Sequence, residues 1–497
     1  MTVPSVDGAD ESGDVFAERR GKLAAWRQAG SVYPTRFQPR DEIGPLRAAY
    51  AGLEAGADSG ETRRVAGRVI ARRGHGKLTF VVLKDFSGEL QLMAQLDALG
   101  EQAYAALEQI DLGDFVGAEG TVMSTRRGEL SLRIVFWRLL SKSLRPLPEK
   151  FHGLTDVETR YRKRYLDLMV NDESREVFLK RARIIRAIRE FLDLRGFVEV
   201  ETPVLQSLYG GAMARPFTTH HNELERDLYL RIATELYLKR CIIGGIDRVY
   251  EMGKDFRNEG VSFKHNPEFT MLETYEAYVD YNHVMDMVEQ MIAEAARAVG
   301  DLKVQFRDHD IDLTPPWPRL TMRAAILDKT GIDIAERRDV PTLHEAIKGA
   351  GLDGIVPLVS TWGKQVDQIF SEMVEPQLIQ PVFITEYPLE LSPFAKKTPH
   401  DPRFVERFEG FIAGMEMCNA FSELNDPEDQ RERFLQQAAD LHAGDDEAHQ
   451  LDEAFLEAME HGMPPTGGMG MGIDRLVMLL TGSASIRDVI LFPALRG

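Results

Sequence analysis

Two short segments carry the residue types that a nucleotide-using site needs. The run RNEGVSFKHNPEF, from Arg257 to Phe269, places an arginine, an acid, a histidine and an aromatic ring around one turn. The run GMGMGIDR ends at Arg475, after closely spaced glycines that let a ligand approach the backbone, although such a run also suits a tight strand–helix joint. Two arginines can stabilise charge at a phosphate under attack, and an aromatic ring can stack on a base. Together the segments predict chemistry at the α-phosphate of ATP.

Glu273 stands on the apolar face of a predicted strand. Side chains of a strand alternate between its two faces, so Glu273 points the same way as Phe269, Met271 and Tyr275. An isolated buried charge is very costly, and we therefore expect a cation beside this carboxylate. A side chain of the protein or a cationic ligand could supply it.

A second predicted strand, MEMCNAFSEL, repeats the pattern with Asn419, Phe421 and Glu423 on one face. Two carboxylates, an amide and the hydroxyl of Tyr275 could form a pocket for an ammonium group. At roughly 4 Å from a carboxylate, an ammonium gains about 4 kcal/mol at an effective dielectric of 20. A pocket for aspartate would instead need an arginine or a lysine at its base. The two strands together favour a ligand over an internal ion pair.

Glu409 and Glu416 lie seven residues apart, shortly before the end of that second strand. Mg²⁺ on nucleotide phosphates usually takes one or two carboxylates and completes its shell with water, so the two residues could share one ion. Two glutamates on an acidic protein are more often solvated, and the spacing alone is a weak signal. Neither GxxxxGK[ST] nor GxGxxG occurs, which excludes a P-loop or a Rossmann turn as the nucleotide holder.

Short apolar runs over residues 64–140, separated by turn signals, predict five strands of a small β-barrel. A helix-like segment over 99–110 lies between the third and fourth runs, as in an OB-fold, a frequent binder of oligonucleotides. Phe80 and Gln91 fall on neighbouring strands with Arg72 nearby, and an aromatic with a side-chain amide suits single-stranded RNA. Another small β-barrel, with the aromatic in its core, is the alternative.

The larger remainder predicts a different architecture. Apolar residues recur at helical spacing over 176–195, and the strand FVEVETPVL follows. Strands and helices then alternate without a regular βαβ repeat, which favours an antiparallel sheet flanked by helices over a doubly wound one. The predicted fold class is α+β, with an N-terminal OB-fold barrel followed by this sheet.

Length and composition limit the classes of protein. A chain of 497 residues predicts two or three domains. The net charge of −19 argues weakly against nucleic acid, but residues 61–164 hold 18 Lys and Arg against 13 Asp and Glu, which is compatible with a basic module on an acidic body. Two cysteines in separate apolar segments fit a reducing compartment. The sequence shows no membrane-spanning run and no secretory signal, and residues 1–13 are expected to be disordered.

Long runs of the sequence resemble the bacterial-type lysyl-tRNA synthetases, a family of class II aminoacyl-tRNA synthetases. The segment ending in HNPEF and the run GMGMGIDR are similar to motifs 2 and 3 of that class, and GFVEVETPVL, with Pro203, is similar to motif 1. The likeness extends from about Val15 to Arg496 and includes RRVAGRVIARRGHGKLTF, KSLRPLPEKFHGLTDVETRYRKRYLDL, GGAMARPFTTHHNEL and YLRIATELYLKRCIIGG.

The resemblance implies four parts of the chain: a helical extension with a linker over 1–60, an anticodon-binding OB-fold over 61–145, a hinge over 146–174 and a catalytic domain over 175–497. Motif 1 would span about 180–206, motif 2 about 247–275 and motif 3 about 465–493. The protein would be a cytoplasmic homodimer, joined through motif 1.

The resemblance also implies a reaction and a role for each candidate residue. Lysine would react with ATP to give lysyl-adenylate and pyrophosphate, with Mg²⁺ as cofactor, and would then be transferred to the 3′ end of tRNA(Lys). Arg257 and Arg475 would be the catalytic arginines, on the α-phosphate and the adenine. The other implied ligands are Glu259, His265, Phe269 and Glu416 for ATP, Gly211, Glu235, Arg257, Glu273, Tyr275, Asn419, Phe421 and Glu423 for lysine, Glu409 and Glu416 for Mg²⁺, and Arg72, Phe80, Gln91 and Glu129 for the anticodon.

One departure from the family pattern and three alternatives remain. Thr234 stands where the family usually has proline, and we expect it to cap the following helix. A ligase that attaches lysine to a protein, like the enzymes that modify elongation factor P, would lack the barrel. An aspartyl- or asparaginyl-tRNA synthetase would not need Glu273 and Glu423. A catalytically silent sensor or RNA-binding paralogue would not keep every family position filled.

Overall fold

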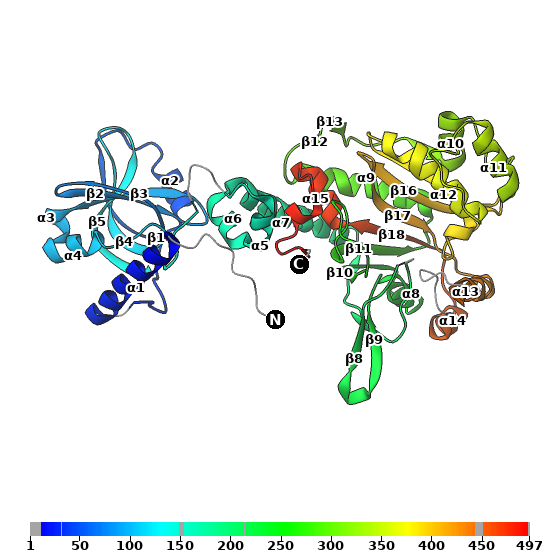
Figure 1. Ribbon diagram of the computed structural model, residues 1–497, viewed down its shortest axis with the longest axis horizontal. Helices are drawn as coiled ribbons and strands as arrows, with labels where there is room; N and C mark the ends of the chain where they lie inside the picture. Colours follow the sequence, from blue (N-terminus) through cyan, green and yellow to red (C-terminus); the bar gives the residue numbers. More distant parts are fainter. Residues whose placement is uncertain (1–10, 31, 149–153, 213, 443–450, 496–497) are drawn as a thin grey trace. The chain divides into compact units, whose positions relative to one another are not determined.

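The structure, a computed structural model, describes residues 11–30, 32–148, 154–212, 214–442 and 451–495. The chain forms two compact units, Met1–Leu154 and Thr155–Gly497 (Figure 1). The disorder predicted at the N-terminus falls on 1–10, outside the described residues, and is wrong at 11–13 because helix α1 (Glu11–Ala29) begins there. None of the helices over these described ranges is long and apolar enough to cross a lipid bilayer.

The first unit contains a closed barrel with the strand order β1-β2-β3-β5-β4. Burial alternates along β2, so Val81 and Leu83 point into the barrel core. Two short helices lie between β3 and β4, where the segment over 99–110 predicts helix, and this arrangement confirms the predicted barrel. The bounds are α2 (Ile43–Ala49), β1 (Asp58–His75), β2 (Leu78–Lys84), β3 (Glu89–Gln95), α3 (Leu96–Leu99), α4 (Glu101–Leu107), β4 (Phe115–Ser124) and β5 (Leu130–Ser141).

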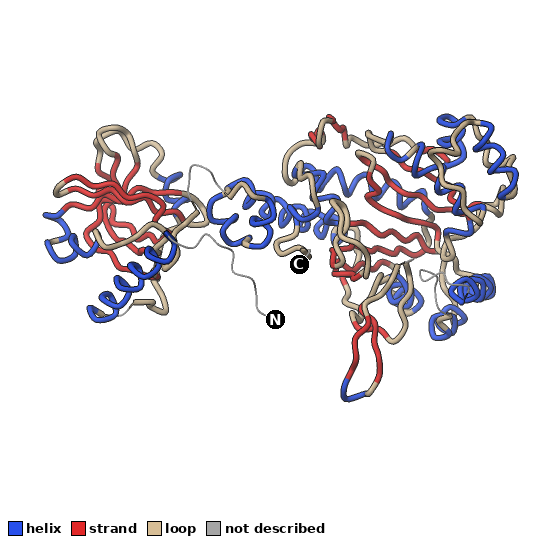
Figure 2. The backbone as a smooth tube through the Cα atoms, in the orientation of Figure 1, coloured by secondary structure: helices blue, strands red, loops and turns tan. Residues whose placement is uncertain are grey.

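The second unit is built on an eight-stranded sheet with the order β14-β15-β16-β17-β18-β11-β10-β6 (Figure 2). Its central pairs are antiparallel, as predicted, and only the edge strands β14 and β6 pair in parallel with their neighbours. The bounds are β6 (Val198–Glu199), β10 (Arg248–Phe256), β11 (Glu268–Ala277), β14 (Arg319–Thr321), β15 (Val382–Pro388), β16 (Phe404–Ile412), β17 (Met415–Ser422) and β18 (Thr466–Gly472).

Helices cover this sheet and bury its apolar face. The helical spacing predicted over 176–195 matches α7 (Asp172–Asp193), whose residues Ile184 and Ile188 join the main core with α9 (Tyr281–Arg297) and α15 (Ile473–Thr481). A second core forms where α10 (Met322–Thr330), α11 (Val340–Gly349) and α12 (Trp362–Met373) pack on the other end of the sheet. The remaining elements are α5 (Val157–Arg162), α6 (Arg164–Val170), β7 (Leu205–Gln206), β8 (Thr218–His221), β9 (Arg226–Leu230), α8 (Glu235–Ile243), β12 (Lys303–Phe306), β13 (His309–Asp312), α13 (Pro427–His442), α14 (Glu453–Glu460) and α16 (Ile486–Val489).

The order of the central strands positions the site. The glycine-rich strand β18 lies between β11 and β17, so the two strands that carry carboxylates on an apolar face flank it. In register, Gly470 pairs with Glu273 on one side and with Asn419 on the other. The two halves of the pocket predicted from separate segments therefore meet across a single strand.

Candidate functional site

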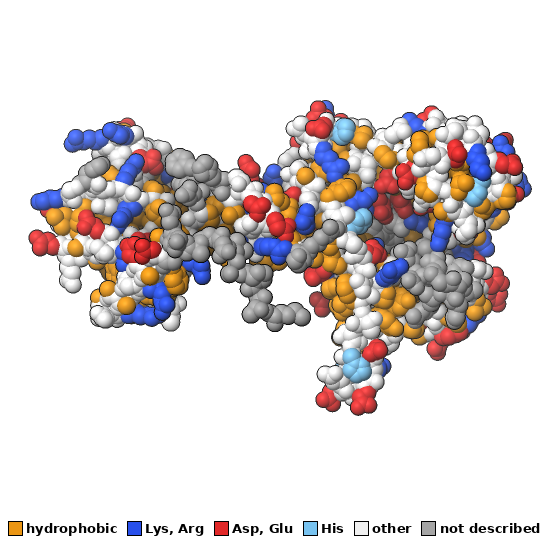
Figure 3. Space-filling view, in the orientation of Figure 1, with side chains coloured by type: hydrophobic (Ala, Val, Ile, Leu, Met, Phe, Trp, Pro, Cys, Tyr) orange, Lys and Arg blue, Asp and Glu red, His pale blue; other side chains and the backbone are white. Residues whose placement is uncertain are grey.

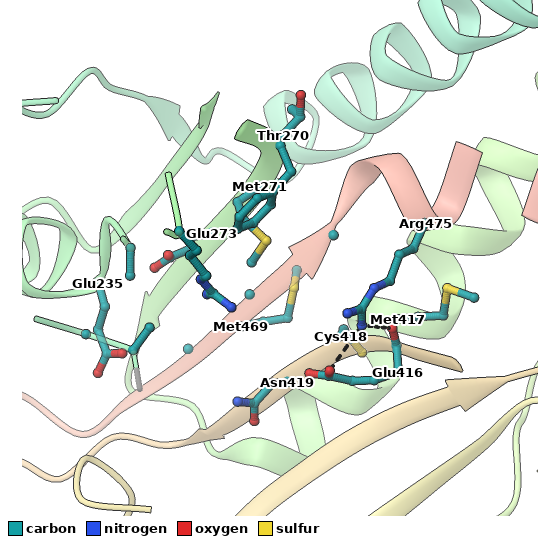
Figure 4. Close-up of a pocket in the computed structure, with 18 of the residues that line it drawn as sticks. Glu235, Thr270, Met271, Glu273, Glu416, Met417, Cys418, Asn419, Met469 and Arg475 are labelled. Carbon is teal, nitrogen blue, oxygen red and sulfur yellow. Dashed lines mark hydrogen bonds and ion pairs between the residues drawn. The ribbon is translucent and has the colours of Figure 1, made fainter. Parts of the chain in front are cut away.

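A cavity of about 400 Å³ lies over β11, β17 and β18 in the second unit. The space-filling view shows acidic side chains in a hollow of this unit (Figure 3). Glu235 and Glu273 lie at one end of the pocket, and Glu416 and Arg475 at the other (Figure 4). The cavity brings together most of the predicted ligands: Gly211, Glu235, Arg257, Glu259, His265, Phe269, Glu273, Tyr275, Glu416, Asn419, Phe421, Glu423 and Arg475 all line it.

Glycines leave room for the buried carboxylates. A Cβ atom on Gly468 would lie 1.9 Å from Glu423 Oε1 and 2.6 Å from the ring of Tyr275, which no side chain could tolerate. Gly211 has a φ of +86°, and a Cβ there would press on the side chain of Glu235 at 3.0 Å. The glycine run is thus more than a strand–helix joint, because it admits the acidic groups to the cavity wall.

Glu273 is buried at the first end of the cavity. Its carboxylate accepts hydrogen bonds from the Thr234 backbone N–H at 3.0 Å and from the Tyr275 hydroxyl at 3.1 Å. Burial, followed by the nearby carboxylates of Asp255 and Glu235, raises the pKa of Glu273 to about 8. In the described part of the chain no cationic side chain forms an ion pair with Glu273. The alternative of an internal ion pair is therefore not met at this residue, and a ligand remains as the source of the expected cation.

The cation lies instead between the other two carboxylates. Lys239 Nζ is 2.5 Å from Glu235 Oε1 and 2.5 Å from Glu423 Oε2, and the lysine is fully buried. Burial alone would lower the pKa of Lys239, but the two carboxylates outweigh it and raise that pKa. Lys239 was not among the residues predicted from the sequence. Glu235 and Lys239 nevertheless lie four residues apart on helix α8, which is a recognisable spacing for an ion pair.

The expected cap at Thr234 is also wrong. Thr234 precedes α8, but its hydroxyl makes no capping hydrogen bond and is buried without a partner among the described groups. Its backbone N–H points away from the helix, to Glu273. Thr234 therefore contacts Glu273 in the cavity wall through its backbone and does not cap the helix through its side chain.

Arg257 and Phe269 form the middle of the cavity. The guanidinium of Arg257 lies 5.1 Å from the centre of the Phe269 ring, and its Nε–H reaches the Ile232 carbonyl at 3.5 Å. No carboxylate of the described residues forms an ion pair with Arg257. Both side chains are half-buried, so a cationic group and a ring face open to the cavity. Glu259, on the following turn, is exposed at its rim.

At the far end, Arg475 is held by Glu416 and His265. Its Nη1 donates to the Glu416 carbonyl at 2.7 Å and to Oε2 at 3.1 Å, and its Nη2 lies 3.3 Å from His265 Nε2. Arg475 holds the pKa of Glu416 below its usual range, although burial acts in the opposite direction. Burial and the neighbouring cations Arg475 and Lys264 lower the pKa of His265 to about 4, so the imidazole is neutral and accepts from Arg475.

Arg407 is a second functional candidate that the sequence analysis missed. Its Nε–H donates to Asn419 Oδ1 at 3.0 Å, and its Nη2 donates to Glu409 Oε1 at 2.6 Å. Glu409 also accepts from the Tyr387 hydroxyl at 3.0 Å, and it lies behind the lining residues rather than among them. Burial and then Glu416 raise the pKa of Glu409 to about 7. The two predicted Mg²⁺ ligands therefore differ in position: Glu416 lines the cavity, whereas Glu409 lies behind its lining residues.

In the barrel, the predicted anticodon residues mostly contact the protein itself. Gln91 is buried, accepts from Arg73 at 2.7 Å and donates to Ser131 Oγ at 2.8 Å. Phe80 is half-buried on β2 with the guanidinium of Arg73 5.4 Å from its ring centre. Arg72 is exposed and donates to the Ile110 carbonyl at 3.1 Å, and exposed Glu129 lies 3.6 Å from Arg47.

Comparisons with known proteins agree with this geometry. Residues 156–496 match the family model for class II tRNA synthetases (D, K and N), and residues 64–140 match that for the OB-fold nucleic acid binding domain. A lysine–tRNA ligase of Moorella thermoacetica is 54% identical over 97% of this chain and 98% of its own. Those of Chloroflexus aurantiacus and Clostridium perfringens are 52% and 50% identical, over 98% and 96% of this chain and 99% and 95% of theirs. The chain belongs to the lysine–tRNA ligase family of class II tRNA synthetases.

Proposed function

We propose that this chain activates L-lysine with ATP to lysyl-adenylate and pyrophosphate and transfers lysine to the 3′ end of tRNA(Lys). The observation that carries the proposal is the buried set of three carboxylates, Glu235, Glu273 and Glu423, in one cavity with the guanidinium of Arg257, which has no carboxylate partner among the described residues. Lysine brings two ammonium groups and one carboxylate, and each has a complementary charge in this cavity. Family membership supports the same conclusion.

The α-ammonium of lysine would bind the Gly211 carbonyl and Glu235, and the ε-ammonium would bind Glu273, Tyr275 and Glu423. Asn419 would take the carboxylate. Because Arg407 donates to the Asn419 oxygen, the amide nitrogen of Asn419 is left to donate to a ligand. Phe421 would line the pocket around the aliphatic stem.

An aspartate substrate fits this cavity poorly, even though Lys239 lies at its base. Lys239 is already neutralised by two glutamates at 2.5 Å, and its ammonium is fully buried behind them. An anionic side chain would face Glu273 and Glu423, where the described residues offer Lys239 as the ion-paired cation and it is already held by Glu235 and Glu423. Like charges close together repel strongly in a buried site. The carboxylates that remain therefore favour a cationic amino acid.

Adenylate formation needs no general base, because the lysine carboxylate is already ionised. Arg257 would contact both that carboxylate and the α-phosphate and would stabilise charge developing in the transition state. Phe269 would stack on the adenine, with Arg475 on the opposite face, and Glu259 and His265 would hold the nucleotide. A neutral His265 can accept hydrogen bonds without adding positive charge.

Glu416 and Glu409 would hold Mg²⁺ beside the phosphates. Burial, and then repulsion from Glu416, raises the pKa of Glu409, and a divalent cation would relieve that repulsion, since carboxylate oxygens suit Mg²⁺. When bound, the metal would neutralise phosphate charge as pyrophosphate leaves. Glu416, which faces the cavity, would be the inner contact, and Arg407 would orient Glu409 behind it.

The remaining parts of the chain would serve tRNA and assembly. We propose that residues 61–145 bind the anticodon through Arg72, Phe80, Gln91 and Glu129, and that 1–60 and 146–174 act as extension and hinge. The catalytic domain over 175–497 would form a homodimer through motif 1, in the cytoplasm. Exposed apolar side chains at Val198, Val204 and Leu205 within motif 1 support an interface there.

The experiment that tests the proposal is amino-acid-dependent ATP–pyrophosphate exchange across all twenty amino acids without tRNA. Exchange with lysine alone is expected, followed by charging of tRNA(Lys) when tRNA is added. Exchange with aspartate or asparagine would overturn the pocket assignment but keep the fold. Absence of exchange with every amino acid, from folded protein with ATP and Mg²⁺ supplied, would favour a silent paralogue.

A further inference from the structure

Lys239 links the two ammonium sites of the proposed lysine pocket. It projects from α8 and lies 2.5 Å from Glu235, which would bind the α-ammonium, and 2.5 Å from Glu423, which would bind the ε-ammonium. Aromatic rings enclose it on the other sides, with the centres of Phe394 and Phe421 at 4.7 and 5.5 Å. Its ammonium is therefore a fixed internal cation and cannot leave for solvent.

Each of the two glutamates gives one oxygen to Lys239 and turns the other toward the cavity. Glu235 Oε2 is 3.7 Å from the Cβ position of Gly211, and Glu423 Oε1 is 1.9 Å from that of Gly468. Both glycines line the cavity. Glu423 Oε1 is buried and has no hydrogen-bond partner within the described residues, so it is an acceptor without a donor.

The charges of this region balance only with a particular ligand. Within the described residues, the three buried carboxylates Glu235, Glu273 and Glu423 have one cation in ion-pair contact, Lys239, which pairs with Glu235 and Glu423. An amino acid with two ammonium groups supplies the two missing charges, whereas one with a neutral side chain supplies only one. An uncompensated buried charge is costly, so the pocket discriminates by charge count as well as by contact.

We infer that Lys239 is a specificity-determining positioning residue, which orients Glu235 and Glu423 with one free oxygen each and sets the charge so that a doubly cationic amino acid completes it. This inference rests on the proposed function. It goes further in assigning selectivity to a residue that does not touch the substrate. Without Lys239, three carboxylates would face two substrate ammonium groups, and one carboxylate would have to keep a proton.

The test compares Lys239→Met with Lys254→Met, which removes an exposed lysine paired at 3.8 Å with Glu268 outside the cavity. For Lys239→Met, we expect the KM for lysine in exchange to rise about a hundredfold, the loss typical of a broken buried pair, with kcat and the KM for ATP within about threefold of wild type. Lys254→Met should leave all three unchanged.

The pH profile separates this role from a merely structural one. Glu273 binds the ammonium when ionised and has a pKa of about 8, so the KM for lysine of the wild type should fall as pH rises toward 8. In Lys239→Met, Glu235 and Glu423 lose their cation and hold protons more tightly, so that fall should extend to higher pH. Loss of packing alone would not move the profile.

The outcomes distinguish the inference from the proposed function. If the wild-type protein shows no lysine-dependent exchange, the proposed function itself is overturned. If wild-type exchange is normal, and Lys239→Met has the same KM for lysine and the same pH profile as wild type, only the role inferred for Lys239 is overturned. If that variant does not fold, calorimetry of lysine binding to wild type at pH 7 in two buffers gives the answer, because the charge count requires release of protons, from Glu273 and from any other carboxylate whose pKa burial raises, and no release overturns it.

Discussion

The two ends of the cavity hold their charges in opposite ways. At the amino-acid end, Lys239 pairs with two of the three buried carboxylates, and burial, followed by the carboxylates of Asp255 and Glu235, raises the pKa of the third, Glu273, to about 8. At the nucleotide end, Arg475 is already paired with Glu416, and the pKa of His265 falls to about 4 beside cations. Figure 4 shows Glu235 and Glu273 at one end of the pocket and Glu416 and Arg475 at the other.

This difference indicates which kind of ligand each end of the cavity is suited to bind. The amino-acid end has more carboxylates than cations in ion-pair contact with them. We therefore expect the ammonium groups of a substrate to replace the proton that Glu273 holds. The nucleotide end offers positive charge from Arg257, which has no carboxylate partner in the described part of the chain, and it attracts phosphate. Electrostatic strain of this kind is commonly retained at sites where binding relieves it, at a cost in stability.

The largest effect should come from Arg257→Ala, which removes the cation of the nucleotide end. We expect lysine-dependent exchange to fall at least about a thousandfold, because transition-state charge loses its main stabiliser. Lysine should still bind weakly by calorimetry, since the amino-acid end is intact. Arg307→Ala, another arginine over a phenylalanine ring but outside the cavity, is the control that should keep full exchange. Near-normal exchange by Arg257→Ala would sink the assignment.

Glu273→Gln should affect lysine and stability in opposite directions. The KM for lysine should rise about a hundredfold, because a charged acceptor is lost from a buried site. The folded pKa of about 8 exceeds the ordinary value, so the folded protein keeps a proton between pH 4.5 and 8 and loses stability as pH rises through that window. At pH 8, Gln should therefore raise the free energy of unfolding by on the order of 1 kcal/mol or more.

The measurement for this variant is denaturant unfolding at pH 5 and pH 8, alongside exchange kinetics. The gain should be present at pH 8 and small at pH 5, where Glu273 is protonated in the folded state. Glu268→Gln, on the same strand but exposed, is the control and should change neither quantity. A Glu273→Gln protein that is less stable at pH 8 would show that the carboxylate is not strained.

The pH dependence of the two substrates should differ in the wild-type enzyme. The KM for lysine should fall up to about tenfold per pH unit between pH 6 and 8, because binding must displace the proton of Glu273. The KM for ATP should change less over this range, since His265 titrates near pH 4 and Glu409, with a pKa of about 7, lies behind the residues that line the cavity. Parallel profiles for the two substrates would break the contrast between the ends.

Phe269→Ala should give a smaller effect, restricted to the nucleotide. Stacking of a base on an aromatic ring contributes roughly 1–3 kcal/mol, so the KM for ATP should rise about tenfold to a hundredfold. The KM for lysine should change little, because the proposed contacts to the lysine ammonium come from Glu273 and Glu423 and not from that ring. Equal changes in both KM values would mean that the strand, and not the stack, had been disturbed.

The sequence predicted the amino-acid end better than it predicted its internal cation. Glu273 and Glu423 are visible from the sequence because a carboxylate on the apolar face of a strand violates a simple period of two. Lys239 has one partner close in sequence, Glu235, but its place between two carboxylates was missed because the tertiary fold brings Glu423, just after β17, to it. Arg407 was missed because Asn419 reaches it across paired strands. The cap at Thr234 failed because Glu273, remote in sequence, takes its backbone N–H.

The barrel shows a second limit on what can be predicted from the sequence. The five strands and the helical segment over 99–110 follow from turn signals and apolar runs, and the structure confirms them. The proposed base contacts do not follow in the same way, since a polar group on a barrel can serve the protein as well as RNA. Gln91, with both ends of its amide bonded internally to Arg73 and Ser131, is the case in point.

The smallest effect should therefore come from Gln91→Ala, measured against Phe80→Ala. The Phe80 ring is half-buried and can stack on a base, so its loss should raise the KM for tRNA(Lys) in aminoacylation about tenfold. The Gln91 amide must give up existing hydrogen bonds to read a base, and its removal should cost only about twofold to threefold. Exchange without tRNA should be unchanged in both variants. A larger loss from Gln91→Ala than from Phe80→Ala would show that the amide leaves Ser131 and reads the anticodon directly, which the buried geometry argues against.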